Sequence, residues 1–180
     1  MIKHFYCPDC NSITSSLVDS IITTNDPRIF SSIRLNRHCE CGSIMEEIDS
    51  GIILTIKNLN DAKLKTINSC EGHIVLDKDT DHVEDYRNAY IMFDPDISRY
   101  ILKTIIAAYP LPDGWEIDEG LECFGFEDDC ICIRYTKLDN IYSIPLEAFM
   151  EIKQQYLYDI MVWSKTILTD HNSGMVPKDE

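Results

Sequence analysis

Two pairs of cysteines near the start of the chain have the spacing of zinc ligands. Cys7 and Cys10 are separated by two residues, so one tight turn directs both sulfurs at one metal ion. Cys39 and Cys41 follow later, and Gly42 is able to take the positive φ that closes a second turn. Four thiolates hold Zn²⁺ tetrahedrally. The sequence therefore predicts a zinc ribbon over residues 1–48, with Zn²⁺ as its cofactor.

The fourth zinc ligand is open because only one residue separates Cys39 from Cys41. The usual two-residue spacing, counted back from Cys41, selects His38 instead. A thiolate is the commoner ligand of structural zinc, which favours Cys39 and leaves His38 as the alternative. A further alternative is four buried or disulfide-bonded cysteines without a metal.

A second group of reactive side chains lies in one short segment, Ser69, Cys70, Glu71, Gly72 and His73. Gly72 predicts a break in a strand, and such a break exposes backbone N–H groups that bind small anions. We expect a ligand-binding turn here, with a nucleotide or another small anion as ligand. Cys70 and His73 would also suit a nucleophile and its base. The alternative is a hairpin turn around a buried cysteine.

Hydrophobic periodicity predicts the elements that position these residues. Short strands are expected around the zinc ligands, at residues 3–6, 13–23, 29–37 and 43–48. Further strands are expected at residues 63–68, 74–76, 89–93, 115–117, 121–126 and 130–135. Helices are expected at about 50–60, after the Asp94-Pro95-Asp96 segment, and at 144–169. Residues 77–87 are expected to form a polar acidic loop.

Two details of this arrangement bear on the predicted sites. Asp49 or Ser50 is expected to cap the first helix. Strands 74–76 and 89–93 are expected to be neighbours, which would bring His73 near Phe93 and Asp94. The element order favours an α+β fold, in which a compact domain at 49–170 has a mixed or antiparallel sheet and a long C-terminal helix. Residues 171–180 are expected to be a flexible tail.

Three later cysteines are a weaker candidate for a metal site. Cys130 and Cys132 point to the same face of a predicted strand, and Cys123 precedes them. No fourth ligand is evident beside them. Buried core cysteines are the favoured interpretation.

The segment from Leu64 to Ile74 resembles the wybutosine-synthesis methyltransferases, a family in which a threonine-rich strand leads into a Ser-Cys-Ser-Gly-Arg-Ile turn. Residues 89–97 are similar to that family's strand ending in a His-Asp-Pro segment. The resemblance covers about residues 50–107. It implies a shared fold for this central module and an S-adenosylmethionine-dependent, methyltransferase-like activity.

This resemblance places Ser69, Cys70 and Gly72 on the family's turn, whereas His73 replaces its arginine and Phe93 replaces its histidine. The chain also resembles uncharacterised small proteins of bacteria and their phages. Those proteins share a threonine strand, a Cys-x-Gly-His turn and a Leu-Pro-x-Gly-Trp segment.

The charge is strongly negative, with a formal net charge of −15 over 180 residues. Residues 1–48 hold four basic and six acidic side chains, which leaves −13 for the rest of the chain. Such a surface repels phosphate backbones, so duplex nucleic acid is not an expected partner. A protein partner with a basic surface is expected instead.

No signal peptide and no membrane span are expected, because no segment approaches the roughly twenty apolar residues that a span needs. Eight cysteines without a leader favour a reducing cytoplasm, in a bacterial cell or in the host of a phage. The leading hypothesis is a cytoplasmic zinc-binding accessory or interaction protein of bacterial or phage type, such as an inhibitor of a host nucleic-acid-handling enzyme. The nucleotide or small-anion binder and the methyltransferase-like enzyme are the alternatives.

Overall fold

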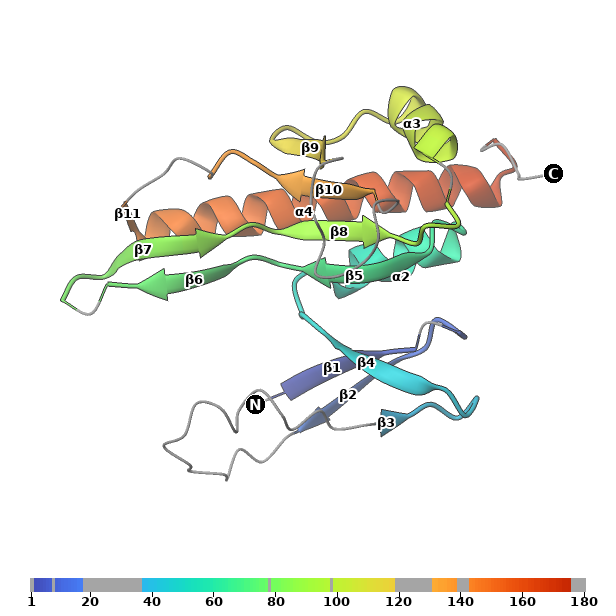
Figure 1. The fold of residues 1–180 in the computed structure, drawn as a ribbon, viewed down its shortest axis with the longest axis horizontal. Helices are drawn as coiled ribbons and strands as arrows, with labels where there is room; N and C mark the ends of the chain where they lie inside the picture. Colours follow the sequence, from blue (N-terminus) through green and yellow to red (C-terminus); the bar gives the residue numbers. More distant parts are fainter. Residues whose placement is uncertain are drawn as a thin grey trace.

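The structure is a computed structural model that describes residues 2–7, 9–17, 37–77, 79–97, 99–118, 131–138 and 143–175. Every strand pair within these ranges is antiparallel. Strands and helices occur together in one chain, with a long helix at the C-terminal end (Figure 1). The prediction of an α+β fold is confirmed, and its sheets are antiparallel rather than mixed.

The N-terminal part is a four-stranded sheet of short strands with the order β2-β1-β4-β3. Its members are β1 (Ile2–Tyr6), β2 (Ile13–Leu17), β3 (Arg37–His38) and β4 (Ile44–Ile48). Two turns join neighbouring strands of this sheet, one between β1 and β2 and one between β3 and β4 (Figure 1). These turns carry the four N-terminal cysteines.

The remaining strands form two further sheets among the described residues. One has the order β5-β8-β10-β9, from β5 (Thr66–Cys70), β8 (Tyr90–Phe93), β10 (Cys132–Tyr135) and β9 (Trp115–Asp118). The other has the order β11-β7-β6, from β11 (Ile144–Pro145), β7 (His82–Arg87) and β6 (His73–Leu76). Strands predicted at 18–23, 29–36 and 121–126 lie outside the described residues.

Together, β5 to β8 form one long hairpin with a break part-way along each arm. Figure 1 shows β6 continuing the line of β5, and β8 continuing the line of β7. Cys70 pairs with Tyr90 before the break, and His73 pairs with Arg87 after it. The segment around Gly72 is therefore an interruption in a strand, as predicted, and not a hairpin turn.

Three helices complete the described structure: α2 (Ile53–Asp61), α3 (Arg99–Ala108) and α4 (Leu146–Asn172). The main core gathers apolar side chains of the sheets and of these helices, with Tyr156, Ile160 and Trp163 from α4. Trp115 and Trp163 are both buried there. Helix α4 starts two residues after the predicted position and continues to Asn172, past the predicted end of the domain.

Several sequence predictions about local structure were wrong. Residues 82–87, predicted as a polar loop, are a strand that pairs with β6 and β11; Val83 is buried, and Glu84 and Asp85 are exposed. Helix α2 begins after Ile52 without a side-chain cap, since the Asp49 carboxylate accepts the Glu71 N–H instead.

The predicted neighbours of one strand were also wrong. Strand β6 pairs with β7, and β8 pairs with β5. His73 therefore lies opposite Arg87, just after the break part-way along the hairpin, whereas Phe93 pairs with Thr66 at the open end, so His73 does not lie beside Phe93 and Asp94.

The N-terminal sheet shares its core with the rest of the chain. Tyr6 is buried in the main core, and Ile13 and Ile48 pack against it. Phe5, Cys7 and Met45 form a smaller buried cluster on the other side of the sheet. The boundary expected near residue 48 therefore separates two sheets that are packed together.

Candidate metal centre

The four N-terminal cysteines converge, with their sulfurs all within 4.8 Å of one another. Cys7 Sγ lies 3.6 Å from Cys41 Sγ, and Cys10 Sγ lies 3.4 Å from Cys39 Sγ. All four thiols are free, and these separations are far longer than the roughly 2 Å of a disulfide bond. A tetrahedral zinc ion with bonds of about 2.3 Å spaces its sulfurs by about 3.8 Å. The donor set and its spacing therefore fit a zinc ion.

Two turns of nearly the same design present the thiols. In the first, the Cys7 N–H donates to the Ser12 carbonyl at 2.9 Å. In the second, the Cys39 N–H donates to the Ser43 carbonyl at 2.8 Å. The residue before each serine has a positive φ, 58° at Asn11 and 95° at Gly42. The shorter Cys39–Cys41 spacing is thus absorbed by a turn that is one residue shorter.

Hydroxyl groups on the two turns adjust the acidity of the thiols. Hydrogen bonding by Ser12, followed by the Cys41 N–H and Cys10, lowers the pKa of Cys39 to about 6. Ser43 lowers the pKa of Cys41 in the same way. Burial, the largest effect at Cys7, raises its pKa to about 11. Zinc binds thiolates, so the hydrogen bonds at Cys39 and Cys41 favour the ionised form that a metal requires, whereas burial opposes it at Cys7.

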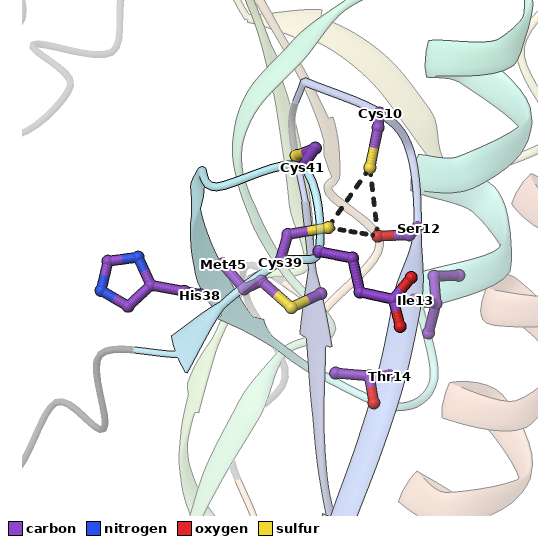
Figure 2. A pocket seen from close by; sticks show the side chains of 9 residues that line it. Cys10, Ser12, Ile13, Thr14, His38, Cys39, Cys41 and Met45 are labelled. Carbon is purple, nitrogen blue, oxygen red and sulfur yellow. Dashed lines mark hydrogen bonds between the residues drawn. The ribbon is translucent and has the colours of Figure 1, made fainter.

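The structure places Cys39, and not His38, with the other ligands. Figure 2 shows the His38 ring pointing away from the thiols of Cys10, Cys39 and Cys41. The nearest polar contact of the ring joins His38 Nδ1 to the Gly42 carbonyl oxygen at 3.4 Å. The geometry therefore favours four thiols over three thiols and an imidazole.

A hollow of about 790 Å³ opens beside the centre, lined by Cys10, Cys39 and Cys41 among others (Figure 2). Cys7, by contrast, is buried. The centre is therefore closed by protein on the Cys7 side and reaches the surface on the other.

The predicted ligand-binding turn at residues 69–73 is dominated by contacts with α4 and with residues 49–52, the link before α2. Lys153 Nζ lies 2.8 Å from Glu71 Oε1 and donates to the Gly72 carbonyl at 2.9 Å. Tyr156 donates its hydroxyl to the Glu71 carbonyl at 2.8 Å. Gly72 has a φ of 85°, in the left-handed region that glycine adopts readily.

The N–H groups of this turn already have acceptors. The Glu71 N–H donates to Asp49 Oδ2 at 3.1 Å, and the Gly72 N–H donates to Cys70 Sγ at 3.3 Å. Ser69 instead lines a small cavity of about 50 Å³ between β5 and the N-terminal sheet, beside Tyr6 and Ile48. Occupied N–H groups and nearby carboxylates give an anion little to bind.

The turn does bring Cys70 and His73 together, as the sequence predicted, and adds Asp49. One ligand atom from each lies within 4.8 Å of the other two. Burial raises the pKa of the Cys70 thiol. Sequence reasoning missed Asp49 because it assigned this residue to a helix cap, and its partners are more than twenty residues away.

Of the later cysteines, Cys132 is buried in β10. Its thiol donates to the Ile133 carbonyl at 3.4 Å. Cys123 and Cys130 lie outside the described residues. A core role for Cys132 agrees with the sequence interpretation.

Comparisons with protein-family models, with curated proteins and with solved structures find no match to this chain. The resemblance to methyltransferases therefore stays a prediction, as do nucleotide binding and methyl transfer at the turn. No helix in the described ranges is long and apolar enough to cross a membrane.

Proposed function

We propose that the cluster of Cys7, Cys10, Cys39 and Cys41 binds one Zn²⁺ as a structural site. The observation that supports this is the convergence of all four sulfurs within 4.8 Å on two matched turns. Four protein ligands fill the tetrahedral shell and leave no position for a substrate, which is the pattern of structural rather than catalytic zinc. The metal joins the β1–β2 turn to the β3–β4 turn and so holds the zinc ribbon together.

Zinc that co-purifies with the full chain tests this proposal. We expect about one zinc per chain from cells grown without added metal, and loss of that zinc in Cys41→Ser. Cys132→Ala is the matched control, because its thiol is buried away from the cluster, and it should keep the metal. Full zinc occupancy in Cys41→Ser would refute the assignment.

The chain around this centre acts as an accessory protein that binds the basic surface of a partner protein. Two features support this proposal: a zinc site without an open position, and a net charge of −15. A host enzyme that handles nucleic acid carries such a basic surface, and a phage-type inhibitor would compete with its nucleic acid.

Capture on the immobilised chain, followed by a functional assay, tests this second proposal. A captured partner should elute as salt rises, because screening weakens contacts between exposed charges. The partner's nucleic-acid binding should fall when the chain is added in excess. A partner that binds nucleic acid equally well with and without the chain would rule out inhibition.

A further inference from the structure

Three ligand-type side chains meet where the link before α2 passes the break between β5 and β6. Asp49 lies in that link, Cys70 ends β5 and His73 begins β6. Their ligand atoms all lie within 4.8 Å of one another. His73 Nε2 is 3.6 Å from Asp49 Oδ2. A carboxylate, a thiol and an imidazole thus point at a common position, separate from the four-cysteine centre.

Backbone hydrogen bonds hold two of these groups in place. Asp49 Oδ2 accepts the Glu71 N–H at 3.1 Å, and Cys70 Sγ accepts the Gly72 N–H at 3.3 Å. The positive φ of Gly72 fixes the strand break between Cys70 and His73. The donors are therefore positioned by the fold before any ligand arrives.

The local charge favours a cation. Lys153 is already bound by Glu71 Oε1 and by the Gly72 carbonyl. Among the described residues, the ion pair found for Asp49 is the one with His73, and no lysine or arginine pairs with its carboxylate. Glu71 is also tied to the link, since its Oε2 accepts the Gly51 N–H at 2.7 Å. A divalent cation would supply the permanently charged partner that the Asp49 carboxylate lacks.

We propose that Asp49, Cys70 and His73 form a second zinc site with one position open to water. One thiol and one imidazole favour zinc over magnesium or calcium, which prefer oxygen ligands. Bonds of about 2.0–2.3 Å require donors about 3.3–3.8 Å apart, a modest closing of the present spacing. The side chains of Asp49 and His73 are 32% and 58% exposed, so solvent reaches the fourth position.

Zinc binding to the full chain, with the four-cysteine centre already loaded, tests the second site. Equilibrium dialysis against chelator-buffered free zinc should show a second zinc per chain. We expect this second binding to weaken at least about 100-fold in each of Asp49→Asn, Cys70→Ser and His73→Ala. Loss of a residue that only hydrogen-bonds a metal ligand typically costs about 10- to 100-fold in metal affinity. Asp85→Asn is the control, because this exposed carboxylate lies on β7 outside the cluster.

Cobalt in place of zinc gives an independent readout of the same ligands. With the four-cysteine centre already filled by Zn²⁺, added Co²⁺ should give thiolate charge-transfer absorption in the wild-type chain, and Cys70→Ser should abolish it. Wild-type protein that binds only one zinc would overturn the proposal. A second zinc retained by all three variants would overturn it as well, because it would be a surface ion bound elsewhere.

Discussion

Asn11 has two roles in the structure, one for its backbone and one for its side chain. Its φ of 58° closes the first cysteine turn, where the second turn uses Gly42. Its side chain also joins this turn to the rest of the chain, because Asn11 Oδ1 accepts the Tyr6 hydroxyl and Asn11 Nδ2 donates to Asp61 Oδ1 at 2.9 Å. Asp61 is the last residue of α2.

Substitution of Asn11 should distinguish the backbone role from the bridging role. Asn11→Gly keeps the left-handed conformation and loses the side-chain bridge, which should cost about 1–3 kcal/mol for two lost hydrogen bonds. Asn11→Ala loses both and should cost about 1–2 kcal/mol more, because a Cβ disfavours positive φ. Urea unfolding of the zinc-loaded proteins measures the difference. Equal stability of the two variants would contradict the role of φ.

The choice between Cys39 and His38 is testable at the same scale. Cys39→Ala should lose zinc because its sulfur is one of the four that converge, whereas His38→Ala should keep it because its ring points away (Figure 2). Mass spectrometry of the intact protein under native conditions reports bound zinc directly. Loss of metal in His38→Ala alone would reverse the assignment.

At the scale of elements, helix α4 fastens both breaks of the long hairpin. The Ala89 N–H donates to the Tyr86 hydroxyl at 3.1 Å, which in turn donates to the Tyr156 hydroxyl at 3.4 Å. Tyr156 then donates to the Glu71 carbonyl. Backbone groups freed by the breaks are thereby satisfied by tyrosines rather than by strand pairing.

Gly72 should be intolerant of any side chain. A Cβ there would lie 2.9 Å from both the Tyr86 and the Tyr156 hydroxyl oxygens, in addition to the strain of positive φ. We expect Gly72→Ala to cost about 2–4 kcal/mol, from strain and crowding together. Gly174→Ala is the control, since it has positive φ but no atom within 4 Å, and should cost at most about 2 kcal/mol. Thermal and urea unfolding compare the two; matching losses would argue against crowding.

Asp94 and Lys65 form an ion pair at the end of the β5–β8 pair that lies away from the break, next to Thr66 and Phe93. Lys65 Nζ lies 2.8 Å from Asp94 Oδ2, and the Asp96 N–H donates to Asp94 Oδ1 at 2.9 Å. The Lys65 contact is the larger cause that holds the pKa of Asp94 below its usual value, and the Asp96 N–H adds to it.

This lowered pKa predicts how stability depends on pH. A carboxyl group with a depressed pKa in the folded state stabilises it above the unfolded pKa, near 4, and loses that contribution as pH falls through the folded pKa. Asp94→Asn should therefore be about 1 kcal/mol less stable at pH 6, a modest value because Lys65 is exposed. The gap should shrink towards pH 3. Urea unfolding of both proteins across this range measures it, and a gap that grows with acidity would contradict the ion pair.

At the scale of the whole molecule, the N-terminal sheet is coupled to the rest of the chain through a shared core. Tyr6 is buried against the main core, although it belongs to the sheet that carries the cysteines. Loss of zinc should therefore disturb the packing of Tyr6 as well as the cysteine turns.

The net charge predicts weak nucleic-acid binding by the chain as a whole. With 31 acidic and 16 basic side chains, few cations are available to displace the counterions of a phosphate backbone. We expect no binding of duplex DNA or tRNA below about 100 μM at physiological salt, at the weak end of non-specific affinities. Fluorescence anisotropy with labelled duplex and tRNA measures this. Micromolar binding that weakens steeply with salt would contradict it and would favour a tRNA-modifying role.

The sequence by itself determined the features that depend on neighbouring residues. The cysteine turns are closed by hydrogen bonds that span at most five residues, such as Cys7 to Ser12, so spacing and residue type were enough to find them. The break at Gly72 followed equally from one residue's backbone freedom.

Only the tertiary structure decided what those features meet. Asp49 joins Cys70 and His73 because the link before α2 crosses the strand break, and Lys153 reaches Glu71 from a helix more than eighty residues later. Strand β7 escaped recognition because its exposed charges conceal the burial of Val83, which only pairing with β6 and β11 explains. Contacts of this range depend on how whole elements pack, and local residue patterns carry no record of that packing.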